Sequence, residues 1–229
     1  MYVDFVPNEP GWLFHAVSRS LIFIGLPYCR PQFTGLENIP KEGPVILVAN
    51  HQSYMDIGAV GVPLWRVGRL YDNYWIIGKK TYQNPYLNWY LKMAPMIVVN
   101  GTIDKALIAL QHNKIVTLYP EGTYQWLKIL SKKQGKPEPE YEFKKSAALL
   151  ALHAGAPIVP VGIWGTDKVM PPFSAWPKPM TFGANFGKPL NYGQNTARRI
   201  PEKDVSDIVA EVMAEVHRLK QMGPPTKGK

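Results

Sequence analysis

The sequence is poor in cysteine, since Cys29 is the single one among 229 residues. A disulfide framework within the chain and a zinc site built from cysteines are therefore excluded, and a reducing compartment fits. Acidic residues are outnumbered, 17 against 26 lysines and arginines, which gives a formal net charge of +9. This excess of positive charge favours anionic partners, such as phospholipid headgroups, nucleic acid or an acidic carrier protein.

Long hydrophobic runs are also absent from the first 30 residues. The uninterrupted apolar stretch, residues 21–27, is far shorter than the roughly 20 residues that span a bilayer. The acidic start, without a small-residue cleavage pattern, predicts against a signal peptide. The positive charge and the seven tryptophans favour a helix over residues 12–28 that lies in one leaflet of a membrane. Packing of this helix on the rest of the domain is the alternative.

Several recognition motifs are missing as well. Basic residues are spread along the chain, and their densest group, residues 128–145, is interleaved with glutamates, so we expect no nucleic-acid partner. Gly183 and Gly187 lack the strand and helix of a dinucleotide site. The histidines outside residues 50–56 show no metal-ligand spacing, so we expect no metal.

Short apolar runs alternate with helical patterns, which predicts one α/β layered domain. The expected strands are residues 45–49, 74–77, 96–99, 115–118, 158–163 and 180–186. The expected helices, besides the first, are residues 57–64, 86–93, 104–111, 144–153 and 205–222. We expect a polar connector over 31–44, a mobile loop over 131–141 and a disordered tail over 223–229.

Residues 50–56, Asn-His-Gln-Ser-Tyr-Met-Asp, follow the buried run 45–49. Ligands of open α/β sheets bind beyond the carboxyl ends of the strands, so His51 is placed to meet a substrate. A histidine can take a proton from a hydroxyl, and a carboxylate on its other ring nitrogen fixes the tautomer. On a straight helix, positions five apart do not share a face, so His51 must precede the helix to reach Asp56.

Two further segments accompany predicted strands, one after a strand and one within it. Residues 119–123, Tyr-Pro-Glu-Gly-Thr, follow the run 115–118, and a Glu-Gly turn there could bind substrate hydroxyls or anchor a loop. Residues 158–161, Ile-Val-Pro-Val, place Pro160 inside a strand, which predicts a sheet edge or a bulge.

Together, and in this order, these three segments resemble the glycerolipid acyltransferase superfamily, of which bacterial 1-acylglycerol-3-phosphate acyltransferase is typical. The lead-in Gly-Leu-Glu-Asn-Ile-Pro at 35–40 also looks like that family, and so does Phe-Lys-Lys-Ser-Ala at 143–147. The resemblance implies an αβα sandwich with a mixed, mostly parallel sheet and an N-terminal membrane-associated helical element. The resemblance covers roughly residues 33–190, and with the element pattern we expect boundaries at 1–32 for that element, 33–222 for the acyltransferase domain and 223–229 for the tail.

The resemblance also implies an activity. A fatty acyl group would pass from acyl-CoA or acyl carrier protein, as co-substrate and without a cofactor, to a lyso-lipid hydroxyl, with 1-acylglycerol-3-phosphate as the expected acceptor. His51 would be the general base and Asp56 its orienting carboxylate, and direct attack fits the absence of a Gly-x-Ser-x-Gly nucleophile elbow. The implied substrate-binding residues are Ser53, Lys79, Glu121, Gly122, Thr123 and Pro160. Membrane phospholipids are expected partners, at the cytoplasmic face of the cell membrane.

Asn100 and Tyr124 depart from the family pattern, because arginines linked to the acceptor's phosphate usually stand there. A lysine could substitute only as a point charge, without the bidentate fork of arginine. One alternative therefore keeps the chemistry and changes the acceptor to an aminolipid, a glycolipid or another lyso-lipid without a phosphomonoester. A second alternative is a non-catalytic lipid-binding protein.

Overall fold

The computed structural model describes residues 11–79, 92, 94–99, 103–122, 124–171, 174, 176–195 and 200–225. Within them the strands are β1 (Gln32–Thr34), β2 (Val45–Ala49), β3 (Asn73–Gly78), β4 (Met96–Val99), β5 (Ile115–Leu118), β6 (Ile158–Trp164) and β7 (Gly183–Phe186). The α-helices are α1 (Trp12–Cys29), α2 (Asp56–Arg66), α5 (Asp104–Gln111), α6 (Tyr124–Lys133), α7 (Ser146–Ala154), α8 (Thr166–Val169) and α9 (Glu202–Met222). Two 3-10 turns are η1 (Leu36–Asn38) and η2 (Leu70–Asp72).

The strands form one seven-stranded sheet in the order β1-β7-β6-β2-β5-β3-β4. Five of the six strand pairings are parallel, and only β6 and β7 pair antiparallel. The expected mixed, mostly parallel sheet is therefore confirmed. Because β6, β2 and β5 are parallel neighbours, their carboxyl ends meet at the same edge of the sheet.

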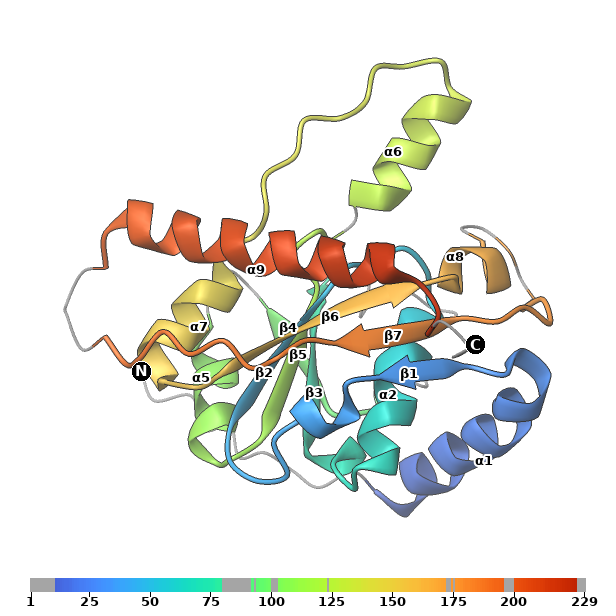
Figure 1. Ribbon diagram of the computed structural model, residues 1–229, viewed down its shortest axis with the longest axis horizontal. Helices are drawn as coiled ribbons and strands as arrows, with labels where there is room; N and C mark the ends of the chain where they lie inside the picture. Colours follow the sequence, from blue (N-terminus) through green and yellow to red (C-terminus); the bar gives the residue numbers. More distant parts are fainter. Residues whose placement is uncertain are drawn as a thin grey trace.

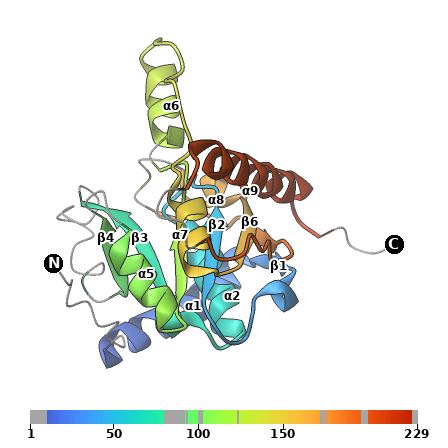
Figure 2. The same ribbon diagram turned by 90° about the vertical axis from the view of Figure 1, so that its left-hand side faces the viewer.

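Helices cover both faces of this sheet, and β2 shows why. All five of its residues are buried, as expected of a strand covered on both sides. Ile46 and Val48 belong to the core shared with α5, α7 and α9, whereas Val45, Leu47 and Ala49 belong to the core shared with α1 and α2. Figures 1 and 2 show the resulting three layers, from which α6 projects.

The buried runs predict most element boundaries closely. The predictions for β2, β4, β5 and α5 match residue for residue, and those for β3, β6, β7, α1, α2, α7 and α9 overlap the observed elements, whereas β1, α6 and α8 were not predicted. The predicted connector over 31–44 is wrong in part, because it contains β1 and η1. The predicted loop over 131–141 begins inside α6. Apart from residue 92, the predicted helix over 86–93 lies outside the described residues.

Pro160 does not lie at a sheet edge or a bulge, contrary to the prediction. Pro160 lies in β6, an interior strand between β2 and β7, and pairs with Val48 of β2. Its carbonyl accepts the amide of Gly187 at 2.9 Å, one residue beyond the end of β7. The N–H and C=O of a strand residue point to the same side, so the donor that proline lacks faces the place where the β6–β7 pairing ends.

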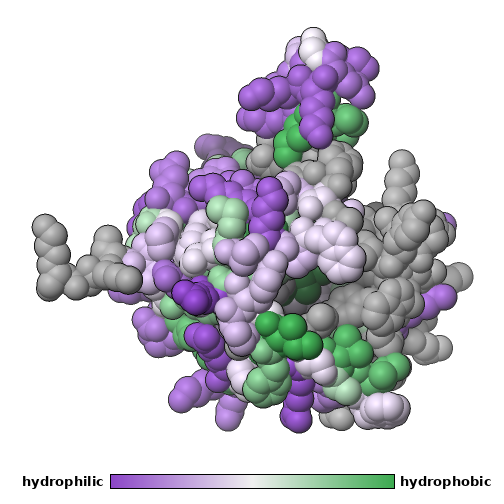
Figure 3. All heavy atoms as spheres, turned by 90° about the vertical axis from the view of Figure 1, so that its right-hand side faces the viewer, coloured by the Kyte–Doolittle hydropathy of each residue, from purple (hydrophilic) through white to green (hydrophobic). Residues whose placement is uncertain are grey.

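Helix α1 packs on the domain with one side and exposes apolar side chains on the other. Phe14, Ser18 and Ile22, at helical spacing, are buried. Trp12 and Ile24 are 79% and 74% exposed. In the view of Figure 3, apolar side chains gather in the lower part of the molecule, over α1. Among the described helices, none combines the length and the apolar character needed to cross a bilayer.

Candidate active site

His51 and Asp56 form a hydrogen-bonded pair at the carboxyl end of β2. His51 lies in the turn two residues after the strand, and Asp56 is the first residue of α2. His51 Nδ1 lies 2.8 Å from Asp56 Oδ2. The non-helical turn between them bends the chain back, which brings positions five apart into contact. The imidazole is 23% exposed and the carboxylate is fully buried.

Asp56 is surrounded by hydrogen-bond donors. The amides of Gln52 and Ser53 donate to Oδ2 at 2.7 and 2.9 Å, and the hydroxyl of Thr166 donates to Oδ1 at 2.6 Å. Thr166 opens α8, just past the carboxyl end of β6. With His51 included, four donors fix the orientation of this carboxylate. The carboxylate can then hold the imidazole in the orientation that points its Nδ1 proton at Asp56. Sequence reasoning missed Gln52 and Thr166.

The turn itself is anchored by Asn50 and Ser53. The Asn50 side chain accepts from the amide of Ile163 and donates to its carbonyl, at 2.7 and 3.0 Å, which ties the turn to β6. Ser53 is fully buried, and its hydroxyl donates to the Met170 carbonyl at 2.7 Å and accepts the Met55 amide at 3.2 Å. This placement gives Ser53 a structural role in the turn, and its predicted contact with substrate stays a prediction.

Glu121 follows β5, the other neighbour of β2, and supports His51 through its backbone amide. Its Oε2 accepts the backbone amide of His51 at 3.1 Å, and its Oε1 accepts His217 Nε2 at 3.1 Å. Glu121 is 3% exposed. Burial raises its pKa, but the hydrogen bonds from His217 and the His51 amide, with the charges of His217 and Lys220, hold the pKa below its ordinary value. The predicted contact of Glu121 with the acceptor stays a prediction.

Tyr119 forms one wall of the site. Its ring stacks on the imidazole of His51, with centroids 4.6 Å apart and an interplanar angle of 28°. Burial, together with the negative charge of Asp56, raises the pKa of the Tyr119 phenol well above its usual range, so the ring stays neutral. The stacked ring limits the directions in which the imidazole can turn.

Gly122 provides the tight turn after Glu121. Its φ of +53° lies in the left-handed region, and a Cβ there would lie 3.1 Å from Lys144 Nζ. The ammonium of Lys144 is therefore held next to this turn. Lys79 lies just past β3 and is exposed. Thr123 and Asn100 lie outside the described residues, as does the side chain of Tyr124.

The arrangement suits a base, because a hydrogen bond from Nδ1 to Asp56 leaves Nε2 of His51 to accept a proton. Within the described part of the chain, no three His, Cys, Asp or Glu side chains come together as a metal site.

Known proteins resemble this chain over its central part. The chain is 28% identical over 167 residues to a chloroplastic 1-acyl-sn-glycerol-3-phosphate acyltransferase of Brassica napus. This match covers 69% of this chain and 44% of that protein. The 1-acyl-sn-glycerol-3-phosphate acyltransferase of Saccharomyces cerevisiae is 29% identical over 149 residues, covering 60% of this chain and 44% of that protein. The matches thus span less than half the length of these two relatives.

A solved structure and a family model agree with this likeness. The crystal structure of the 1-acyl-sn-glycerophosphate (LPA) acyltransferase PlsC from Thermotoga maritima shares the fold, with a TM-score of 0.60 and 24% identity over 91% of this chain and 80% of that one. The Acyltransferase family model matches residues 30–164, more than half of the chain, and this stretch contains the His51–Asp56 pair, Glu121 and Pro160. The chain therefore belongs to the acyltransferase family.

Proposed function

We propose that this protein transfers a fatty acyl group from acyl-CoA or acyl carrier protein to a hydroxyl of a lyso-glycerolipid, with 1-acylglycerol-3-phosphate as acceptor. The observation that carries the proposal is the 2.8 Å hydrogen bond between His51 and Asp56 at the carboxyl end of β2, in a chain of the acyltransferase family. A proton acceptor beside a thioester is what acyl transfer to a hydroxyl requires.

The reaction follows from the protonation state of the imidazole, in which Nδ1 carries the proton and Nε2 is free. With its Nδ1 proton held by Asp56, His51 accepts the proton of the acceptor hydroxyl at Nε2. The hydroxyl oxygen attacks the thioester carbonyl, and the carbon–sulfur bond breaks as the tetrahedral intermediate collapses. The imidazolium then returns its proton to the departing thiolate. An ester and a free thiol result, without an acyl-enzyme and without a cofactor.

Lys144 supports an anionic acceptor. Its ammonium lies beside Gly122, at the turn that also carries Glu121, the acceptor of the His51 amide. A point charge can attract a phosphomonoester at this place, although it lacks the bidentate geometry of arginine. The net charge of +9 suits both an anionic lipid and an anionic acyl donor.

The exposed apolar side of α1 supports attachment to one leaflet of a membrane, which is where lyso-lipid acceptors reside. Trp12 and Ile24 on this side could enter the interface while the buried side of α1 keeps its contacts with the domain. Membrane phospholipids are thus proposed partners. The acyl donors, acyl-CoA and acyl carrier protein, favour the cytoplasmic face of the cell membrane.

Asn100 and Tyr124 favour a second candidate, in which the same chemistry acts on a lyso-lipid without a phosphomonoester. The two candidates differ in how they use Lys144. Only an acceptor that carries a phosphate gains from its charge.

An acceptor panel separates the candidates. Purified protein in mixed micelles receives palmitoyl-CoA or palmitoyl-acyl carrier protein with lysophosphatidate, a lysoglycolipid or a lyso-aminolipid, and the acylated product is quantified by mass spectrometry. We expect lysophosphatidate to be the best acceptor. Lys144→Gln should raise its KM by about tenfold, from the loss of one charge-assisted contact.

The control is Lys136→Gln, in the exposed segment after α6, which should leave this KM unchanged. Preference for a phosphate-free acceptor, with no effect of Lys144→Gln, would favour the second candidate. No product with any acceptor and either donor would favour the lipid-binding alternative.

A further inference from the structure

Helix α9 reaches the His51 turn from the far end of the chain. His217, on its fifth turn, places Nε2 3.1 Å from Glu121 Oε1, while the other oxygen of Glu121 accepts the His51 amide at 3.1 Å. His217 thus contacts the catalytic base through one buried carboxylate. Its own side chain is 42% exposed, so solvent reaches the ring on its other side.

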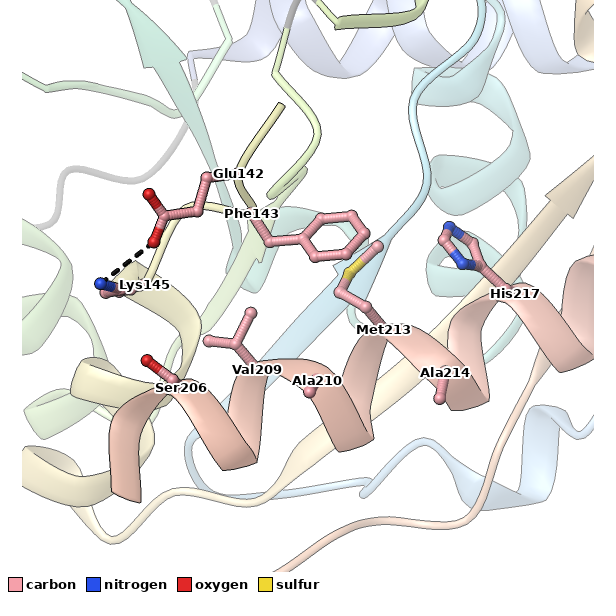
Figure 4. Close-up of a pocket in the computed structure, with 9 residues that line it drawn as sticks. All are labelled: Glu142, Phe143, Lys145, Ser206, Val209, Ala210, Met213, Ala214 and His217. Carbon is pink, nitrogen blue, oxygen red and sulfur yellow. Dashed lines mark ion pairs between the residues drawn. The ribbon is translucent and has the colours of Figure 1, made fainter. Parts of the chain in front are cut away.

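His217 is held in place by the segment after α6. Its ring lies 5.9 Å from the ring of Phe143, and Phe143 meets Tyr141 edge to face at 5.2 Å. The Tyr141 hydroxyl donates to the carbonyl of Pro120, the residue before Glu121. Figure 4 shows Phe143 extending toward Met213 and His217 along α9, in the wall of a pocket of about 370 Å³. Two segments distant in sequence therefore converge on the turn that carries Glu121.

The direction of the His51 ring depends on this support. Asp56 fixes one ring nitrogen, but the position of the whole residue is set by its backbone, and Glu121 holds the backbone amide. Because the pKa of Glu121 lies below its ordinary value, the carboxylate is ionised at neutral pH and is a strong acceptor. If His217 no longer donates, a buried anion keeps fewer partners and turns toward others.

We propose that His217 is a positioning residue for the acyl transfer, which acts by holding Glu121 against the backbone of His51. The inference rests on the proposed function, because it takes His51 to be the base. A shift of about 1 Å in a reacting group can cost on the order of 100-fold in rate, so the effect falls on kcat.

The test compares three substitutions of His217 with wild type, using the acceptor and donor that wild type prefers. His217→Gln keeps an N–H that can reach Glu121, whereas His217→Leu has no donor and His217→Asn is one methylene shorter than glutamine. We expect kcat to fall between about 10- and 100-fold in the Leu and Asn variants, with KM changed less than about threefold. The Gln variant should stay within about threefold of wild type.

The matched control is His153→Leu, on the exposed side of α7, which should keep wild-type kcat. Melting temperatures are measured for all variants, so that a loss of folded protein is separated from a loss of rate. If the Leu variant does not fold, the comparison of Gln with Asn decides. Double substitution of Glu121→Gln and His217→Leu should lower kcat no further than the larger single effect, since both remove the same support.

Three results would overturn the inference. They are a folded Leu variant with wild-type kcat, a Gln variant as slow as the Asn variant, or a rise in KM at unchanged kcat, which would indicate direct contact with substrate. Failure of the proposed function has a different signature, because wild type would then form no acylated product or His51→Ala would keep the activity of wild type.

Discussion

Asp56 shows how a single side chain can determine the chemistry of its neighbour. Backbone amides, the Thr166 hydroxyl and the His51 ring all donate to this fully buried carboxylate. Since donors fix both oxygens, the carboxylate cannot turn away from the imidazole. The hydrogen bond to Nδ1 then selects the tautomer in which Nε2 is free to accept a proton.

Glu121 gives the stability of the protein a dependence on pH. Because the folded state lowers the pKa of Glu121, its ionised form stabilises the fold above the unfolded pKa of about 4.3, and this contribution is lost as pH falls through the folded value. Glu121→Gln should lower the free energy of unfolding by about 1–3 kcal/mol at pH 7, from the weakened hydrogen bonds of a buried group. The difference from wild type should shrink toward pH 3.5. Urea unfolding at the two pH values measures it.

The control for this prediction is Glu140→Gln, on an exposed residue of the segment after α6. It should change the free energy of unfolding little at either pH. A Glu121→Gln deficit of the same size at pH 7 and pH 3.5 would show that the charge of Glu121 does not stabilise the fold.

At this scale the sequence identifies residues whose motifs are local. His51 and Asp56 stand five apart, so their contact could be predicted once a turn was placed between them. His217 could not be predicted, because its partner Glu121 is 96 residues away and nothing within α9 marks it. The turn-stabilising hydrogen bond of the Ser53 hydroxyl to Met170 could not be predicted either, because the two residues lie far apart in the sequence.

At the scale of elements, burial decides which segments could be predicted. Strand β2 and helix α5 match their predictions because burial imposes a clear apolar pattern on them, from both cores on β2 and from one core on α5. Strand β1 has three residues and owes its place to pairing with β7, a partner distant in sequence. Helix α6 projects from the body (Figure 1), and its side chains from residue 127 on are exposed or half-buried, so burial there does not mark a helical period.

Helix α1 allows a test of membrane attachment. Trp12→Ser combined with Ile24→Ser should weaken binding to vesicles of phosphatidylcholine and phosphatidylglycerol by about 10- to 100-fold, because two large apolar side chains no longer enter the interface. Flotation of protein with vesicles measures the bound fraction.

The matched control is Leu127→Ser with Leu130→Ser, two exposed apolar residues of α6. This pair should change the bound fraction less than about threefold, because α1 and not α6 is the proposed anchor. Equal losses in the two double variants would contradict a specific role for α1.

At the scale of the whole molecule, the order of the strands assembles the site. His51, Glu121 and Thr166 follow β2, β5 and β6, which are neighbours in the sheet although they are far apart in the chain. Their carboxyl ends share one edge because the three strands are parallel, and α9 adds His217 there. Alternating strands and helices predict this class of fold, but the order of the strands depends on pairings that the sequence does not display.

The central claim is that His51, oriented by Asp56, is the base of an acyl transfer. The most direct measurement is acceptor-dependent release of thiol from palmitoyl-CoA by wild type, His51→Ala and Asp56→Asn, with Asp104→Asn on the exposed start of α5 as control. The account predicts a loss of about 10²–10⁴ in kcat for His51→Ala and a comparable loss for Asp56→Asn, which favours the wrong tautomer. The control should keep wild-type activity. Acceptor-dependent release by His51→Ala at the wild-type rate would contradict the account.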